Sequence, residues 1–122
     1  MNLRMIKGVS LFSNVGIAET YLKDCGIDIV VANELLKERA SFYRNLYPEC
    51  NMIEGDITDD KIFNEIISNS IKHQCKFLIA TPPCQGMSVA GKRDYNDPRN
   101  SLIIKVIEAI DKIDPDYVII EN

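Results

Sequence analysis

The sequence predicts an α/β protein with a doubly wound parallel sheet, in which helices cover both faces of the strands. Short runs of apolar, often β-branched residues alternate with segments of helical period, and turn-forming residues separate the two kinds of segment. The length of 122 residues fits one small domain.

The apolar runs predict five strands. Each run is short and bounded by turn-forming residues, as expected of buried strands. The predicted strands cover residues 6–13, 27–32, 51–54, 76–81 and 117–120. Because helical segments separate consecutive strands, the strands are expected to run parallel.

The first two helices are predicted after the first and second strands. The first runs from near Gly16 to Asp24 and stops at Gly26, a residue suited to a helix C-terminus. In the second helix, apolar residues recur at helical spacing, and Pro48 ends it. The inward residues of this second helix are predicted to be Leu36, Ala40, Tyr43 and Tyr47.

Two further helices are predicted in the second half of the chain. Thr58 and the acidic pair Asp59-Asp60 open the third helix, because a helix N-terminus favours negative charge. Ser101 is expected to cap the fourth helix. The predicted inner faces are Ile62, Phe63, Ile66, Ile67 and Ile71 on the third helix, and Ile103, Val106, Ile107, Ile110 and Ile113 on the fourth.

Residues 82–100 are predicted to form a long irregular loop, rich in Pro, Gly, Asp and Asn. Loops of this length inside a compact domain are uncommon and usually functional. After the fifth strand the sequence reaches Glu121-Asn122, and a doubly wound sheet that ends there leaves an apolar flank exposed. We therefore expect this chain to be the first part of a longer domain.

Composition narrows the class of protein. The chain is 46% hydrophobic and 26% charged, which is ordinary for a globular protein, and it has no apolar run of membrane-spanning length and no visible signal peptide. A cytoplasmic location is the default expectation. The four cysteines form no Cys-x-x-Cys pair, and His73 lies in a polar stretch, so no metal site is expected.

The net charge of −4 gives no support for nucleic-acid binding by the chain as a whole. If the protein acts on nucleic acid, its main binding surface lies elsewhere, or binding uses the local basic group of Lys92, Arg93 and Arg99.

Polar and turn-forming residues follow every predicted strand, at the edge of the sheet where ligands bind in this class. Glu34 after the second strand can accept ribose hydroxyls, and Asp56 after the third can accept an adenine amino group. Phe12 and Ile57 can provide apolar faces for the ring. Since no G-x-G-x-x-G or P-loop motif is present, an adenosine ligand without phosphates fits best, and S-adenosylmethionine is the obvious one.

Cys84 lies on a stiff turn after the fourth strand. The two prolines before it end the strand and restrict the backbone, so the thiol is held in place as a nucleophile would be. The alternative is that Cys84 is one more small buried residue, as free cysteines usually are.

These elements, taken in order, resemble the N-terminal half of the catalytic domain of a cytosine-5 DNA methyltransferase. The resemblance spans nearly the whole chain, and its most specific motif contains Cys84. The matching elements are Leu11-Phe12, Asn33-Glu34, Gly55-Asp56-Ile57, Pro82-Pro83-Cys84-Gln85-Gly86-Met87-Ser88 and Glu121-Asn122. The resemblance implies the Rossmann-like fold of S-adenosylmethionine-dependent methyltransferases, here truncated after the fifth strand.

The resemblance also implies a role for each matching residue. Cys84 is the nucleophile, Glu121 is the acid that engages the target base, Pro83 shapes the catalytic turn and Asn122 supports it. The implied cofactor-binding residues are Phe12, Gly16, Glu34, Asp56, Ile57 and Pro82. The implied substrate-loop residues are Gln85, Ser88, Lys92, Arg93 and Arg99.

The implied reaction is methyl transfer to carbon 5 of cytosine in DNA through a covalent cysteine adduct, with the base flipped out of the duplex. Residues 1–122 would be the N-terminal part of a catalytic domain whose target-recognition domain is absent. The missing C-terminal half, or a complementing chain, would be the partner, and this chain alone is expected not to methylate DNA.

Three departures from the family pattern lead us to expect weak cofactor binding. Ser10 stands where the family usually has Asp, Asn14 and Ile17 replace glycines of the first turn, and Leu35 replaces an aromatic residue.

Two alternative functions stay open. One is an RNA cytosine-5 methyltransferase, and the other is a non-catalytic subunit of a split enzyme. The residues after Cys84 resemble bacterial DNA enzymes, as in restriction-modification systems.

Overall fold

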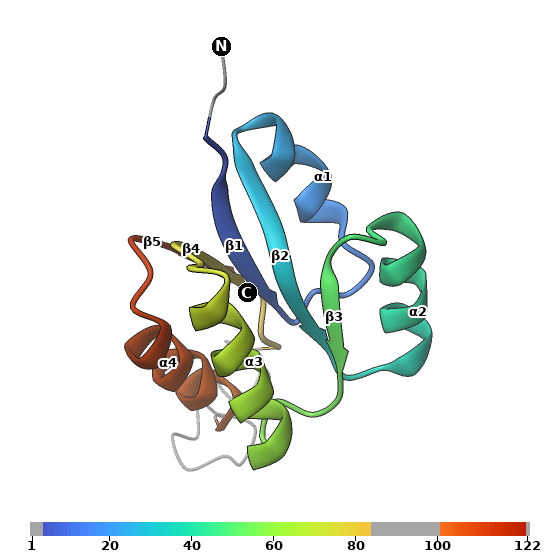
Figure 1. The fold of residues 1–122 in the computed structure, drawn as a ribbon. Helices are drawn as coiled ribbons and strands as arrows, with labels where there is room; N and C mark the ends of the chain where they lie inside the picture. The colour runs from blue at the N-terminus through green and yellow to red at the C-terminus, as the bar shows by residue number, and fades with distance from the viewer. Residues whose placement is uncertain (1–3, 84–100, 122) are drawn as a thin grey trace.

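The computed structural model describes residues 4–83 and 101–121 of the chain. They form a five-stranded sheet in which every neighbouring pair is parallel and the spatial order is β3-β2-β1-β4-β5 (Figure 1). The strands are β1 (Ile6–Leu11), β2 (Ile27–Glu34), β3 (Asn51–Glu54), β4 (Phe77–Ala80) and β5 (Tyr117–Ile120). The predicted α/β class with a doubly wound parallel sheet is confirmed.

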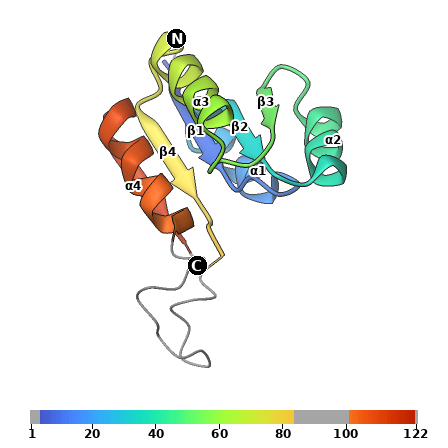
Figure 2. The same cartoon turned by 90° about the horizontal axis from the view of Figure 1, so that it is seen from below.

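The strand order reverses between β1 and β4. The chain first moves outward from β1 through β2 to β3, and then returns to place β4 and β5 on the other side of β1. The carboxyl ends of β1 and β4 adjoin, because Leu11 pairs with Ala80. Figure 2 shows the arrows of β1, β2 and β4 pointing towards the same end. In open α/β sheets, ligands bind outside the carboxyl ends of the strands at such a point.

Helices pack on both faces of the sheet. The helices α1 (Ile17–Asp24) and α2 (Lys37–Leu46) lie on one face, and α3 (Asp60–Lys72) and α4 (Ser101–Ile113) lie on the other. As predicted, a glycine follows the first helix, and Gly26 has a φ of 86° there. The third helix is capped by Asp59, whose carboxylate accepts a hydrogen bond from the amide of Lys61 at 2.9 Å.

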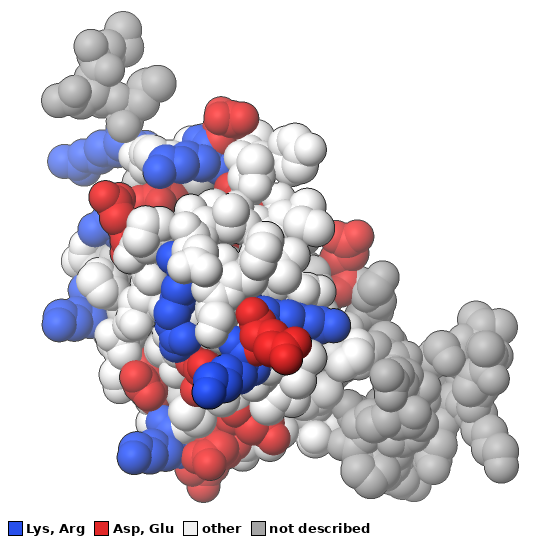
Figure 3. Space-filling view, turned by 90° about the vertical axis from the view of Figure 1, so that its right-hand side faces the viewer, with Lys and Arg blue, Asp and Glu red and all other residues white. Residues whose placement is uncertain are grey.

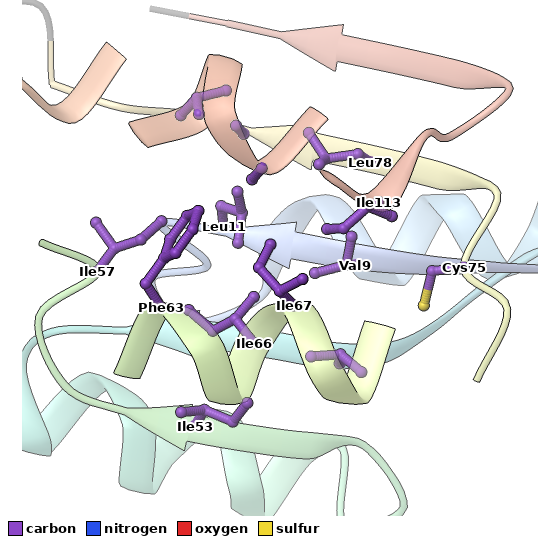
Figure 4. Packing of buried hydrophobic residues seen from close by; sticks show 14 residues of the cluster. Val9, Leu11, Ile53, Ile57, Phe63, Ile66, Ile67, Cys75, Leu78 and Ile113 are labelled. Atoms are coloured by element: carbon purple, nitrogen blue, oxygen red, sulfur yellow. The ribbon is translucent and has the colours of Figure 1, made fainter. Parts of the chain in front are cut away.

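The larger core lies between the sheet and the helices α3 and α4 (Figure 4). Val9 and Leu78 project into it from β1 and β4, while Phe63 and Ile66 project from α3, and all four are buried. A second core lies on the opposite face and contains Ala40 and Tyr43 of α2. Side chains alternate between the two faces of a strand, so β2, β3 and β4 contribute to both cores, whereas β1 contributes Val9 and Leu11 to the larger core.

Some inward residues of the helices were predicted wrongly. Ile71 of α3 and Ile107 of α4 are exposed, while Ser70 and Ala109 beside them are buried. Leu36 is also exposed, because it precedes the first turn of α2. The buried positions follow regular helical spacing. The prediction instead selected positions by their apolar residue type, and so included exposed isoleucines and left out Ser70 and Ala109. In α4 apolar residues cover more of the helix surface than the buried strip of Val106, Ala109 and Ile113, so residue type alone does not identify that strip.

The edge strand β5 exposes apolar side chains. Its four residues are 58, 40, 44 and 47% exposed in chain order from Tyr117 to Ile120. The exposed apolar flank that was expected at this edge of the sheet is therefore present.

Two substitutions on α3 test the buried face of this helix. Ile66→Ala removes a side chain with 0% exposure and should lower the free energy of unfolding by about 2–5 kcal/mol. Ile71→Ala removes one that is 54% exposed and should change it by less than about 1 kcal/mol. Urea denaturation measures both values, and similar losses in the two variants would contradict the orientation of α3.

Candidate functional site

A cavity of about 320 Å³ opens at the carboxyl ends of the strands. This volume lies at the lower end of the range for small-molecule sites. The turns that follow β1, β2, β3 and β4 all contribute to its wall. The lining includes Phe12, Asn14, Asn33, Glu34, Leu35, Leu36, Arg39, Gly55, Asp56, Ile57, Thr81, Pro83 and Leu102.

The turn between β1 and α1 has an unusual backbone. Phe12, Asn14 and Gly16 have φ angles of 57, 55 and 80°. Left-handed conformations are unfavourable for residues with a side chain, and Phe12 is less suited to them than Asn14. Ile17 lies in the first turn of α1 and is not among the residues with positive φ, so replacing a glycine here causes no backbone strain. β1 ends at Leu11, two residues before its predicted end, because the chain turns at Phe12.

Gly16 has both a conformational and a packing reason to be glycine. A Cβ at this position would lie 2.5 Å from the Tyr47 ring and 2.8 Å from the Tyr43 ring. The Tyr47 hydroxyl also donates a hydrogen bond to the Gly16 carbonyl at 2.6 Å. Gly16 therefore faces α2 and does not line the cavity. In the structure Gly16 shapes the turn beside the cavity, and its role in cofactor binding stays a prediction.

Glu34 connects the first two turns around the cavity. Its side chain is buried, and one carboxylate oxygen accepts a hydrogen bond from the amide of Asn14 at 3.0 Å. The other oxygen accepts a hydrogen bond from the amide of Leu36 at 2.7 Å. A carboxylate oxygen has two acceptor sites, so each oxygen of Glu34 keeps one for a ligand hydroxyl.

The third turn is held by Asn33 and presents Asp56. The Asn33 amide group donates hydrogen bonds to the carbonyls of Ile53 at 2.7 Å and Gly55 at 3.0 Å. Asp56 accepts two hydrogen bonds at Oδ1, from the amide and the hydroxyl of Thr58 at 2.9 and 2.7 Å. Its Oδ2 has no hydrogen bond within the described residues, so Asp56 is fixed in place with one oxygen free.

Apolar residues form another part of the wall. Phe12 and Ile57 line the cavity, as the sequence predicted, and Leu102 joins them from the first turn of α4. Leu102, Arg39 and Thr81 were missed: Arg39 and Leu102 lie in helices α2 and α4, and Thr81 was counted within the fourth strand, so no strand-end pattern marks them as cavity wall.

The turn after β4 is hydrogen-bonded to the turn after β1. The Thr81 hydroxyl donates a hydrogen bond to the Phe12 carbonyl at 2.9 Å, which holds the two turns together. Pro83 lines the cavity, whereas Pro82 is fully buried and does not. The Glu121 amide donates to the Ala80 carbonyl at 3.0 Å, so Glu121 lies beside the start of this turn.

Several predicted site residues lie outside the described residues. They are Cys84, Gln85, Ser88, Lys92, Arg93, Arg99 and Asn122. What is described is the backbone on both sides: Pro83 at the cavity and Glu121 at the end of the neighbouring strand.

Two of the described cysteines are poor nucleophiles. Burial raises the pKa of both Cys50 and Cys75 to about 11, so their thiols stay protonated near neutral pH. Cys25 is exposed, but it follows α1 and does not line the cavity.

Among residues 4–83 and 101–121, neither the distribution of charged side chains nor the arrangement of possible metal ligands indicates a second binding site. Acidic and basic side chains are interspersed over the face in Figure 3. No group of three or more His, Cys, Asp or Glu side chains within the described ranges could hold a metal ion. No helix in that part of the chain is both long and apolar enough to cross a membrane.

Sequence comparison identifies relatives of this chain. The sequence model of the family described as C-5 cytosine-specific DNA methylase matches residues 6–122. The chain is 54% identical to the Type II methyltransferase M1.HgaI of Avibacterium volantium, with 96% of this chain and 34% of that protein covered. It is 32% identical to the Type II methyltransferase M.AquIA of Picosynechococcus, with 95% and 48% covered. The chain thus spans less than half of these curated relatives.

Structure comparison supports the same fold. A DNMT2 mutant of Spodoptera frugiperda matches with a TM-score of 0.69 and 27% identity, over 94% of this chain and 34% of that one. A putative DNA modification methyltransferase encoded within an E. coli prophage matches with a TM-score of 0.70. Its identity of 22%, over 90% of this chain and 30% of that one, shows the fold alone.

Gly16→Ala and Gly26→Ala form a matched pair that tests the first turn. Both residues have a positive φ, but a Cβ at Gly26 would meet nothing within 4 Å. Gly26→Ala should therefore cost about 1–2 kcal/mol of unfolding free energy, from backbone strain alone. Gly16→Ala should cost roughly 1–3 kcal/mol more, because the tyrosine rings must move. Equal costs in urea denaturation would show that the rings do not restrict this position.

Proposed function

The chain belongs to the C-5 cytosine-specific DNA methylase family, and from this premise we propose that it forms the cofactor-binding and nucleophile-bearing part of a DNA cytosine-5 methyltransferase. The single observation that carries the proposal is the cavity at the carboxyl ends of the strands. Two fixed carboxylates and an apolar wall surround it, and Pro83, which precedes Cys84, lies at its edge.

The cavity suits the adenosine part of S-adenosylmethionine. Glu34 has acceptor sites left for the ribose hydroxyls, and Asp56 Oδ2 can accept a hydrogen bond from the adenine amino group. Phe12, Ile57 and Leu102 supply apolar contacts for the ring. The exposed Leu35 offers less stacking area than an aromatic residue, which supports the expectation of weak binding.

The proposed chemistry is a covalent addition followed by an elimination. S-adenosylmethionine supplies an electrophilic methyl group. The Cys84 thiolate adds to carbon 6 of cytosine, while Glu121 hydrogen-bonds to ring nitrogen 3 and stabilises the electron density that moves to carbon 5. Carbon 5 would then take the methyl group as the methyl–sulfonium bond breaks and S-adenosylhomocysteine leaves. A base would remove the carbon 5 proton, and the bond between carbon 6 and the Cys84 sulfur would break. Because the reaction needs access to both faces of the base, the cytosine must leave the duplex.

The substrate and partners follow from the same proposal. Residues 85–100 contain the predicted substrate-loop residues, which would contact DNA. The remaining part of a catalytic domain, on this chain or on a complementing one, would supply the main DNA-binding surface. The interspersed charges on the face of Figure 3 support that division, because DNA-binding surfaces are usually basic.

Asp56→Asn tests the adenosine site with little change in shape. The variant keeps an acceptor for Thr58 but replaces the free Oδ2 with an NH2 group, which cannot accept the adenine amino hydrogen. S-adenosylmethionine affinity should fall about tenfold or more in titration calorimetry. The control is Glu54→Gln, which changes a carboxylate on the same strand end that does not line the cavity. Equal affinities in the wild type and Asp56→Asn would contradict the assignment.

Trapping with 5-fluorocytosine tests the nucleophile and the substrate together. Fluorine at carbon 5 cannot leave as a proton does, so the adduct with Cys84 persists on a denaturing gel. The chain should form this adduct with duplex DNA when the rest of the catalytic domain is present, and Cys84→Ser should abolish it. Cys25→Ser is the control and should leave the adduct intact.

The other outcomes of trapping decide between the alternatives. An adduct with RNA but not with DNA would make the protein an RNA methyltransferase. No adduct with either would indicate a non-catalytic subunit. Transfer of labelled methyl groups by the 122 residues alone would show that no further segment is needed.

A further inference from the structure

Glu19 is a buried carboxylate beneath the first turn of the cavity. It lies in the first turn of α1, and only 5% of the residue is exposed. Its Oε1 accepts a hydrogen bond from the Ser10 hydroxyl of β1 at 2.7 Å, and its Oε2 is buried without a hydrogen bond among the described residues. Glu19 itself does not line the cavity.

A hydrogen-bonded connection runs from Glu19 to the turn. The Ser13 hydroxyl donates to the Ser10 carbonyl at 2.8 Å and lies 3.0 Å from the Ser10 hydroxyl. The Ser13 carbonyl in turn accepts from the amide of Gly16 at 3.0 Å. These hydrogen bonds connect α1, through Glu19, to β1, through Ser10, and to the turn after β1, through Ser13. This is the turn in which Phe12, Asn14 and Gly16 have left-handed conformations.

From these contacts we propose that Glu19 is a positioning residue for the cofactor cavity, acting through Ser10 and Ser13 to hold the turn that carries Phe12 and Asn14. The identity of the ligand rests on the function proposed above, but the effect on the turn does not. The turn places the Asn14 amide 3.0 Å from Glu34 Oε1, so a shift of the turn moves both the ring of Phe12 and a partner of Glu34.

The cost of burying Glu19 supports this role. Burial raises the pKa of Glu19, and an apolar side chain would avoid both the desolvation and the unpaired oxygen. The helix N-terminus partly offsets the cost, because it favours an acidic group. Ser10 also stands where the family resemblance expects Asp, and Glu19 brings a carboxyl group to that hydroxyl from the helix.

The test separates turn position from overall stability. Glu19→Leu fills the space with an apolar group, and Ser10→Ala/Glu19→Leu also removes the hydroxyl that would be left unpaired. Replacing both partners by apolar groups has little effect on stability. Glu19→Gln keeps an acceptor for Ser10. Tyr43→Phe is the control, because it alters the neighbouring buried layer and Tyr43 has no hydrogen bond to Ser10.

Hydrogen exchange of the Asn14 amide is the first measurement, compared with the amide of Leu78 in the core. We expect protection of Asn14 to fall about tenfold in Glu19→Leu and in the double variant, as for the loss of one hydrogen bond, with Leu78 unchanged. Glu19→Gln and Tyr43→Phe should match the wild type. Unchanged Asn14 protection in the double variant, or equal loss at Leu78, would overturn the proposal.

S-adenosylmethionine titration is the second measurement. Affinity should fall about tenfold in the variants that lose Asn14 protection and stay the same in Glu19→Gln. If Asn14 protection falls but the wild type binds no S-adenosylmethionine, the positioning role stands and the proposed cofactor is wrong. If protection falls while wild-type affinity persists in Glu19→Leu, the turn does not determine binding, and the proposal fails.

Discussion

The cavity depends on one backbone constraint, the turn after β1 that holds three of five residues at positive φ. Such a turn does not form without support, because Phe12 and Asn14 both carry side chains. The support comes from four directions: the Thr81 hydroxyl, the Glu34 carboxylate, the rings of Tyr43 and Tyr47 at the end of α2, and the buried serines. The elements on both sides of β1 thus meet at a segment of five residues, which explains why the site lies where the strand order reverses.

The carboxylates around the cavity differ in how they are held. Glu34 is buried and its position is fixed by two backbone amides, whereas Asp56 is exposed and fixed by its own turn. Fixed acceptors need little rearrangement when a ligand arrives, and preorganisation of this kind favours binding. In the proposed nucleoside site, this preorganisation would partly offset the modest stacking area.

The sequence predicted the strands well, because each is a short apolar run between strong turn signals. It also pointed to Phe12, Glu34, Asp56 and Ile57, which lie at or shortly after strand ends and line the cavity; their binding roles stay predictions. It could not identify Leu102 or Thr81, since their contributions depend on how distant segments meet. On α4 the sequence correctly named Val106 and Ile113 as buried but also named Ile107, which is exposed, because the apolar residues of that helix cover more surface than the sheet and α3 bury. Glu19 gave no signal, because an acid in the first turn of a helix is ordinarily a solvated one.

The exposed edge of β5 has a practical consequence for work with this chain. An open strand whose side chains are apolar can pair with a strand of any other molecule, including a second copy. At high concentration this favours self-association and precipitation, whatever the stability of each single molecule. Expression yield and sample lifetime would then be limited by the edge of the sheet, and charged substitutions on that strand are the natural remedy.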